Sequence, residues 1–265
     1  FFSDIQNFST FSEQLEPEKM VKLMNEYLTE MTDILLQHQG TLDKYIGDAI
    51  VAFYGAPAPL VDQEKKACST ALMMHNKLDE LRKKWMEEDD WPDIVYQMQH
   101  RIGLNSGQMV TGNMGSEMRM NYTMMGDTVN LAARLEPAAK QYGVYILVGE
   151  KVYEASNDEF AFRFLDFLSV KGKEIPAKTY ELIDRKDLID KRSIELIKTF
   201  EEGLDNYFNQ KWDHAIKSFM KAINFEDDFP GRNTNPSQVF IDRCNYFKQN
   251  PPDLNWDGVW KMTSK

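Results

Sequence analysis

The stretch TLDKYIGDAIVAFY, residues 41–54, is the part of the sequence that decides the fold. Two short apolar runs flank Gly47-Asp48, a pair typical of a tight turn. The pattern predicts a β-hairpin, with one strand over about 41–46 and the other over about 49–54. Asp48 is therefore expected at the tip of this hairpin.

The sequence before and after the hairpin predicts further helices and strands, which together make an α+β domain. Residues 1–5 look like the end of a strand, and Pro17 is typical of the first position of a helix, whose apolar face recurs every three or four residues until Gly40. Further helices are expected at 63–86, near Val152 and at 127–142, and further strands at 100–105, 108–112, 145–148, 162–170 and 179–183. Residues 87–93 and 116–120 are polar and are expected to be surface loops. The order βαββαβ predicts a ferredoxin-like α+β fold, with a mainly antiparallel sheet and helices on one face.

A small all-helical extension is predicted over residues 190–265, after a first domain at 1–185. The sequence turns polar near 184–190, and helices are then expected over 194–208, 212–224 and 237–249. The pattern around Phe200, Trp212 and Ala222 resembles one tetratricopeptide-type helix pair. A single such pair cannot bury its own apolar face, so we expect it to pack on the first domain or on a partner.

Composition restricts the possible partners of the 265-residue chain. Its net charge of −11 argues against nucleic acid, which is bound by basic surfaces, but leaves a nucleotide substrate open. No apolar run approaches the roughly 20 residues that span a bilayer, and no signal peptide is visible. Cys68 and Cys244 lie far apart in the sequence, as expected of a reduced intracellular protein. The chain begins at Phe1 inside a strand, so we interpret it as a cytoplasmic fragment that lacks an upstream sensor or membrane domain.

Two aspartates are candidate metal ligands. Asp4 ends an apolar strand and Asp48 occupies the hairpin tip. Magnesium prefers oxygen ligands, and two such ions can stabilise the attacking and leaving oxygens of a displacement at phosphorus. Taken alone, either aspartate is explained more simply as a loop cap or a turn residue.

Further polar residues can contact a nucleotide. Asn130 and Arg134 lie four residues apart on one face of the helix at 127–142, where they can hold a sugar and offer positive charge to phosphorus. Lys44 and Thr123 can read a purine ring, and Arg101 and Lys171 can reach a triphosphate. Taken alone, Asn130 and Arg134 are more typical of a solvated or salt-bridged helix face, and the lysines are typical of a solvated surface.

Five motifs in order along the chain change this assessment. The sequence resembles the class III adenylyl/guanylyl cyclase catalytic domain over roughly residues 1–184. The motifs are Asp-Ile-x-x-Phe-Ser at 4–9, Lys-x-x-Gly-Asp at 44–48, Arg-Ile-Gly-Leu-x-Ser-Gly at 101–107, Gly-Asp-x-Val-Asn-x-Ala-x-Arg at 126–134 and Val-Lys-Gly-Lys at 170–173. Five ordered matches make a chance resemblance very improbable.

The resemblance implies a metal site and a phosphate site. Asp4 and Asp48 would bind two Mg²⁺ ions, with the backbone carbonyl of Ile5 as a further ligand and Mn²⁺ able to substitute. The backbone around Phe8 and Ser9 would cradle phosphates at a helix N-terminus. In addition, Arg101 and Lys171 would hold the β- and γ-phosphates.

The resemblance also implies how the nucleoside is held. Lys44 and Thr123 would read adenine, Asn130 would orient the ribose, and Arg134 would stabilise the transition state. The family works as a head-to-tail dimer in which each site takes residues from both chains. Because this chain carries both sets, the resemblance implies a homodimer with two equivalent sites.

The base-reading positions favour ATP as the substrate, so the expected activity is adenylate cyclase. Guanine-selective relatives usually carry Glu and Cys at these positions, whereas Lys44 would donate to N1 of adenine and would meet the N1–H of guanine as a second donor. Thr123 resembles the Thr-bearing branch, which includes bicarbonate-responsive members. A guanylate cyclase and a catalytically silent module that binds nucleotide or dimerises remain open as alternatives.

Overall fold

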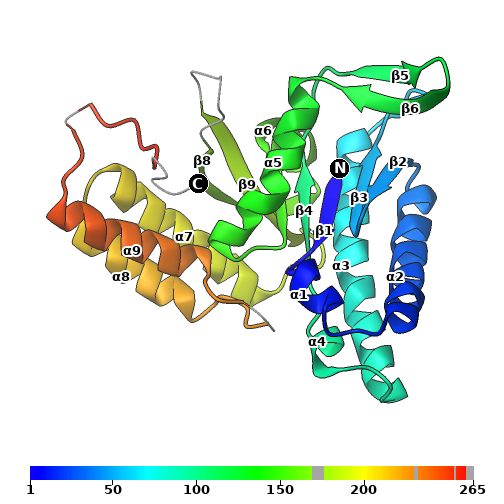
Figure 1. Cartoon of the computed structure of the whole chain (residues 1–265). Helices are drawn as coiled ribbons and strands as arrows, with labels where there is room; N and C mark the ends of the chain where they lie inside the picture. The colour runs from blue at the N-terminus through cyan, green and yellow to red at the C-terminus, as the bar shows by residue number, and fades with distance from the viewer. Residues whose placement is uncertain (169–175, 230–231, 254, 261–265) are drawn as a thin grey trace. The chain divides into compact units, whose positions relative to one another are not determined.

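The computed structural model describes residues 1–168, 176–229, 232–253 and 255–260 (Figure 1). The chain forms two compact units, Phe1–Pro137 and Ala138–Lys265. In the described part of the chain, no helix has the length and apolar character needed to cross a membrane.

The first unit is built on four antiparallel strands. These are β1 (Phe2–Ile5), β2 (Thr41–Ile46), β3 (Ala49–Phe53) and β4 (His100–Leu104), in the spatial order β2-β3-β1-β4. The predicted hairpin is confirmed as β2–β3. Gly47 adopts a left-handed φ of 64° at its turn, a conformation that glycine reaches without steric cost.

Two long helices supply the core of this unit. Helix α2 (Pro17–Gln37) begins at the predicted proline, and α3 (Gln63–Glu88) packs against it. Each buries one stripe of apolar side chains, typified by Leu23 and Tyr27 on α2 and by Met74 and Leu78 on α3. The chain order β1-α2-β2-β3-α3-β4 confirms the predicted βαββαβ arrangement and the α+β class.

Two predicted surface loops are shorter than expected, because helices extend into one range and strands into the other. Residues 116–120 lie at the tip of a second hairpin, in which β5 (Val110–Ser116) pairs with β6 (Arg119–Met125) (Figure 1). The strand predicted at 108–112 overlaps β5, whereas β6 was not predicted. Strand β6 is largely exposed, so it lacks the apolar alternation by which a strand is recognised. Within residues 87–93, α3 continues to Glu88, and the short helix α4 (Asp93–Tyr96) begins after Pro92.

Helix α5 (Asp127–Tyr142) follows β6 and matches its predicted range. It packs directly against β4, where Gly103 allows the close approach. A Cβ atom at position 103 would lie 2.5 Å from the backbone nitrogen of Glu136 and 2.7 Å from the carbonyl oxygen of Ala132. Any side chain there would push the helix away from the strand.

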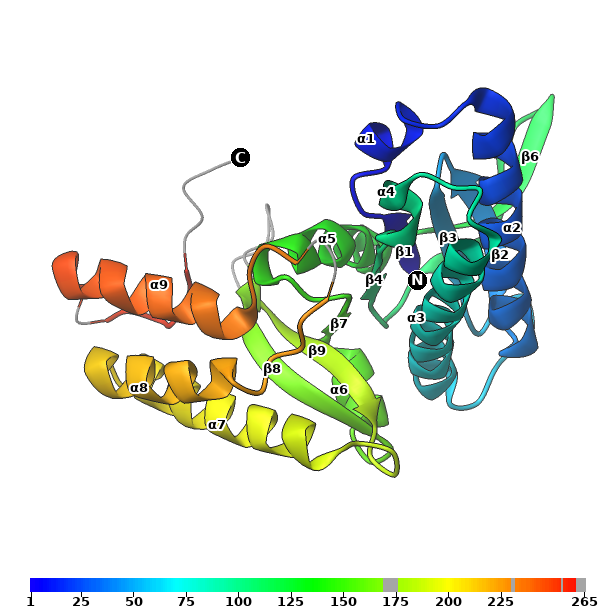
Figure 2. The ribbon, with the colours of Figure 1, turned by 90° about the horizontal axis from the view of Figure 1, so that it is seen from below.

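The second unit contains three antiparallel strands and the C-terminal helices (Figure 2). Strands β7 (Ile146–Gly149), β9 (Ala177–Arg185) and β8 (Phe160–Leu168) pair in that order, and α6 (Glu150–Ser156) follows β7. The three predicted C-terminal helices are α7 (Lys191–Phe208), α8 (Trp212–Ile223) and α9 (Pro236–Gln249). Helix α7 packs on β8, so the helical extension shares this unit with the last strands of the sheet.

Aromatic side chains fill the space between α7, α8 and α9. The rings of Phe200, Phe219 and Phe240 lie 5.2–5.6 Å apart, and all three residues are fully buried. Gly203 allows α7 and α8 to approach, since a Cβ atom there would lie 2.5 Å from the Phe219 ring. The tetratricopeptide-like character of this helix pair stays a prediction.

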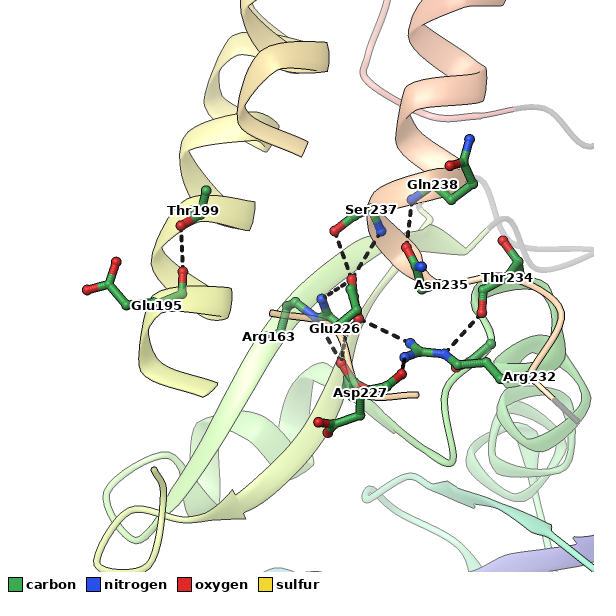
Figure 3. Close-up of polar contacts among 12 residues, drawn as sticks. Arg163, Glu195, Thr199, Glu226, Asp227, Arg232, Thr234, Asn235, Ser237 and Gln238 are labelled. Atoms are coloured by element: carbon green, nitrogen blue, oxygen red, sulfur yellow. Dashed lines mark hydrogen bonds and ion pairs between the residues drawn. The ribbon is translucent and has the colours of Figure 1, made fainter. Parts of the chain in front are cut away.

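A buried cluster of charged side chains joins β8 to the segment between α8 and α9 (Figure 3). Arg163 and Glu226 form its centre, and Arg232 and Ser237 also bind Glu226, at 3.1 and 2.8 Å. The C-terminal helices are therefore held to the sheet by specific polar contacts in addition to apolar packing.

Candidate active site

The carboxyl groups of Asp4 and Asp48 lie side by side, where β1 meets the β2–β3 turn. The backbone N–H of Ile5 donates to Oδ2 of Asp48 at 3.0 Å. Asp48 is 9% exposed, and its pKa is raised to about 7, by burial first and then by its hydrogen bond with Asp4 and the negative charge of that residue. The two carboxyl groups predicted to act together are thus brought together.

This pair suits a divalent cation. Two adjacent carboxylates repel each other when both are ionised, and a cation between them would remove that repulsion. Within the described residues, no group of three or more histidine, cysteine, aspartate or glutamate side chains is placed to hold a metal ion. A pair of carboxylates is compatible with magnesium, which typically takes one or two carboxylates and completes its shell with water and substrate phosphates. The backbone carbonyl of Ile5 lies next to this pair in the chain.

Lys44 and Thr123 are also brought together, although 79 residues separate them. Nζ of Lys44 on β2 donates to Oγ1 of Thr123 on β6, at 3.2 Å. The Lys44 side chain is 40% exposed, so a ligand can still reach it. Strand β6, which was not predicted from the sequence, is the element that brings Thr123 to β2.

Asp43 completes this cluster and was not anticipated. Its Oδ2 accepts a hydrogen bond from Oγ1 of Thr123 at 2.6 Å, and its Oδ1 lies 3.2 Å from Nζ of Lys44. The side chain is 2% exposed. In a regular strand, Asp43 and Lys44 would point to opposite faces, so the sequence contains no signal that both contact Thr123.

Asn130 and Arg134 lie on the exposed face of α5. Within the part of the chain that the structure describes, neither side chain has a hydrogen-bond or ion-pair partner. The two side chains are therefore available to a ligand or to another chain. The contact of Gly103 with α5 holds this helix, and with it both residues, against β4.

Arg101 is more buried than its predicted phosphate-binding role suggested. It is 8% exposed, lies beside Asp4 across the β1–β4 pairing, and donates from Nε to Oε1 of Glu136 at 2.9 Å. Burial raises the pKa of Glu136, an effect that the charge of Arg101 partly offsets. The sequence contains no signal for Glu136, which lies 35 residues from its partner. The phosphate-binding role of Arg101 stays a prediction.

Three further residues were predicted to bind phosphate. Phe8 and Ser9 open α1 (Phe8–Ser12), the short helix that follows β1. Lys171 lies outside the described residues. The phosphate-binding roles expected of all three stay predictions.

Residues 1–184 match the family of adenylate and guanylate cyclase catalytic domains. The chain belongs to this family. Among curated relatives of this cyclase chain, the terminal-differentiation-specific adenylate cyclase of Dictyostelium discoideum is 30% identical over 249 residues. That match covers 92% of the chain and 11% of the relative. The chain spans between 11% and 36% of the length of the curated adenylate cyclases that it matches.

Solved cyclase structures share the fold. The adenylyl cyclase CyaB from P. aeruginosa is 34% identical, with a TM-score of 0.62, and the match covers 71% of this chain and 94% of that one. The guanylate cyclase domain of RhGC from Catenaria anguillulae, in complex with GTP, is 27% identical, with a TM-score of 0.58. That match covers 70% of this cyclase chain and 94% of the other. The family fold therefore occurs both in a protein named adenylyl cyclase and in one named guanylate cyclase.

Proposed function

We propose that this chain is an adenylate cyclase that converts ATP to 3′,5′-cyclic AMP and pyrophosphate. The contact between Lys44 and Thr123 is the observation that supports ATP, and not GTP, as the substrate. A lysine ammonium group has donors only, so it matches the unprotonated N1 of adenine and opposes the N1–H of guanine. The adjacent Asp4 and Asp48 support a reaction at phosphate, since they are the donor set for magnesium.

The chain's own residues would bind and orient the substrate. Lys44 would donate to adenine N1, while Thr123 would accept from the 6-amino group. Asn130 would hold the ribose so that its 3′-oxygen lies in line with the α-phosphorus. Arg134 would stabilise the negative charge that develops on the α-phosphoryl oxygens.

The reaction forms a bond between the 3′-oxygen and the α-phosphorus and breaks the bond to the β-phosphate, which leaves with pyrophosphate. Two Mg²⁺ ions, or Mn²⁺ in their place, held by Asp4, Asp48 and the carbonyl of Ile5, would supply activation of the 3′-hydroxyl and neutralisation of phosphate charge. Arg101, Lys171 and the backbone at Phe8-Ser9 would bind the phosphates. No side chain is assigned as a general base, so water or the substrate would take the 3′-proton.

The site would be shared between two copies of the chain. Asn130 and Arg134 are exposed, as residues that complete a site in another subunit have to be. One subunit would supply Asp4 and Asp48, and its partner would supply the base-reading and transition-state residues. We further propose that residues 1–185 form the catalytic domain and that 190–265 form a helical extension of the tetratricopeptide type.

The first test is product formation from ATP and from GTP, with Mg²⁺ or Mn²⁺, by the wild type and by Asp48→Ala. The proposal expects cyclic AMP from ATP, little cyclic GMP, and loss of product in the variant. Cyclic GMP as the main product would replace it with a guanylate cyclase. Absence of any cyclic product from the dimeric protein would favour a catalytically silent module.

A mixing experiment tests the shared site. Asp48→Ala and Arg134→Ala are each expected to be inactive alone. After equal mixing and re-association, half of the dimers are mixed, and each mixed dimer has one intact site, so about a quarter of the wild-type activity should return. If the two variants recover no activity while forming mixed dimers, each site lies within a single chain.

A further inference from the structure

Asp43 reaches the base-reading pair because of an irregularity in β2. The register of β2 and β3 shifts between Leu42 and Lys44, so Asp43 has no partner residue on β3. Such a bulge redirects a side chain and often lies beside an active site. Here it allows two consecutive residues, Asp43 and Lys44, to contact the same threonine on β6.

The contacts of Thr123 determine which way its hydroxyl proton points. An ionised carboxylate can only accept hydrogen bonds, so the 2.6 Å contact with Asp43 requires the hydroxyl of Thr123 to donate. A hydroxyl has one proton and two lone pairs. One lone pair accepts from Lys44, which leaves Thr123 with one acceptor site and no donor for a ligand.

Lys44 can only donate hydrogen bonds. Its ammonium group has three protons, of which one is donated to Oγ1 of Thr123. Nζ also forms an ion pair with Oδ1 of Asp43 at 3.2 Å, although Oδ1 accepts no hydrogen bond from the described residues. Lys44 therefore keeps protons for a ligand, and the cluster of Asp43, Lys44 and Thr123 presents a donor and an acceptor side by side.

We propose that Asp43 is a positioning residue that selects 6-aminopurines over 6-oxopurines by fixing Thr123 as an acceptor; this rests on the proposed cyclase function. Adenine offers an acceptor at N1 and a donor at its 6-amino group, which matches the cluster at both points. Guanine and hypoxanthine offer the reverse, a donor at N1 and an acceptor at O6. Without Asp43, the hydroxyl of Thr123 could turn and donate to O6.

Burial of the Asp43 side chain stabilises this orientation of the Thr123 hydroxyl. The Asp43 side chain is 2% exposed, so water does not compete for its oxygens, and Lys44 compensates its charge. A threonine in water can exchange donor and acceptor roles by rotating its hydroxyl group. Thr123 discriminates between bases only while its hydroxyl donates its hydrogen bond to Asp43.

The test compares ATP with ITP, whose hypoxanthine base has the same N1–H and O6 edge as guanine but lacks the 2-amino group. The variants are Asp43→Asn, which keeps the shape but can donate to Thr123, and Asp33→Asn, a control with the same charge change at an exposed position on α2. We expect Asp43→Asn to lower the ratio of kcat/KM for ATP to that for ITP about tenfold, the effect of one mismatched hydrogen bond. Asp33→Asn should leave the ratio within twofold of the wild type.

A double-mutant cycle separates this role from a structural one. Thr123→Val removes the hydroxyl, so adding Asp43→Asn to it should change the ratio no further, whereas a general loss of structure would lower both kcat/KM values together. Asp43→Ser provides the same readout if Asp43→Asn fails to fold. A wild-type ratio retained by the folded Asp43 variants would overturn the inference and leave the cyclase function standing. A wild type that cyclises no nucleotide would overturn both.

Discussion

Arg163 on β8 and Glu226 after α8 form a buried two-point ion pair across 63 residues of sequence. The two guanidinium nitrogens donate to the two carboxylate oxygens of Glu226 at 2.7 and 3.2 Å. The side chains are 1% and 4% exposed. Burial alone would raise the pKa of Glu226, but the charge of Arg163 and its hydrogen bonds hold that pKa below its usual value. The pair thus secures the C-terminal helices to the last strands of the sheet.

Glu226→Gln should destabilise the second unit. It removes one partner of a buried pair and leaves Arg163 uncompensated except by Glu181, so we expect a loss of about 3 kcal/mol in the free energy of unfolding. Asp227→Asn is the control, since that neighbouring side chain is 70% exposed and its removal should cost less than about 0.5 kcal/mol. Urea unfolding, followed by far-UV circular dichroism, measures both. Equal stability of the two variants would show that the buried pair contributes little.

Asp48→Asn should make the metal-free protein more stable while removing its response to Mg²⁺. The substitution relieves the repulsion between two adjacent buried carboxylates, a gain on the order of 1 kcal/mol in EDTA at pH 8. Added Mg²⁺ should raise the melting temperature of the wild type and leave that of the variant unchanged. Thermal unfolding in EDTA and in Mg²⁺ tests both halves. A variant that Mg²⁺ stabilises as strongly as the wild type would place the metal elsewhere.

Arg134→Ala should greatly lower the turnover rate without affecting the fold. The side chain is exposed, so its removal should change stability by less than about 0.5 kcal/mol. The expected loss of kcat is roughly 100-fold or more, with a smaller change in KM, because the positive charge acts mainly in the transition state. Lys140→Ala, an exposed cation on the same helix, is the matched control and should keep its activity. A larger effect on KM than on kcat would instead assign Arg134 to substrate binding.

The lowered pKa of the buried His100 predicts how the stability of the protein depends on pH. Its pKa lies well below the usual 6.5, because burial disfavours the charged ring, with His75 and Arg82 adding repulsion. Its Nδ1 lies 3.1 Å from the hydroxyl of Tyr27. The unfolded chain takes up a proton as the pH falls below about 6.5 and the folded chain does not, so the free energy of unfolding should fall.

The pH effect can be isolated by substitution. Between pH 7.5 and 5.5, the wild type should lose about 1.4 kcal/mol more stability than His100→Gln, the value for one proton bound only by the unfolded state. His214→Gln, at an exposed position on α8, should behave as the wild type does. Urea unfolding at the two pH values provides the comparison. An identical pH dependence of His100→Gln and the wild type would contradict the neutral, buried state of His100.

Local sequence patterns were sufficient to predict a large part of the fold. The apolar spacing along 17–37 and 127–142 predicts α2 and α5, because a helix face depends on residues three and four positions apart. The hairpin at Gly47-Asp48 could be predicted for a similar reason, since a tight turn is specified by adjacent residues. Of its apolar side chains, strand β6 buries only Met124 and part of Tyr122, against Val51 and Phe53 of β3, and so its sequence lacks the sustained alternation that would have revealed it.

The sequence by itself determined the family, most of the elements and the candidate residues Asp4, Lys44 and Arg134, because each belongs to a short ordered motif. Only the tertiary structure decided which of these residues meet and what surrounds them. The contact of Asp43 with Thr123 spans 80 residues and depends on a bulge in β2. Contacts of this kind arise from strand register and burial, which are properties of the packed sheet and leave no periodic pattern along the chain.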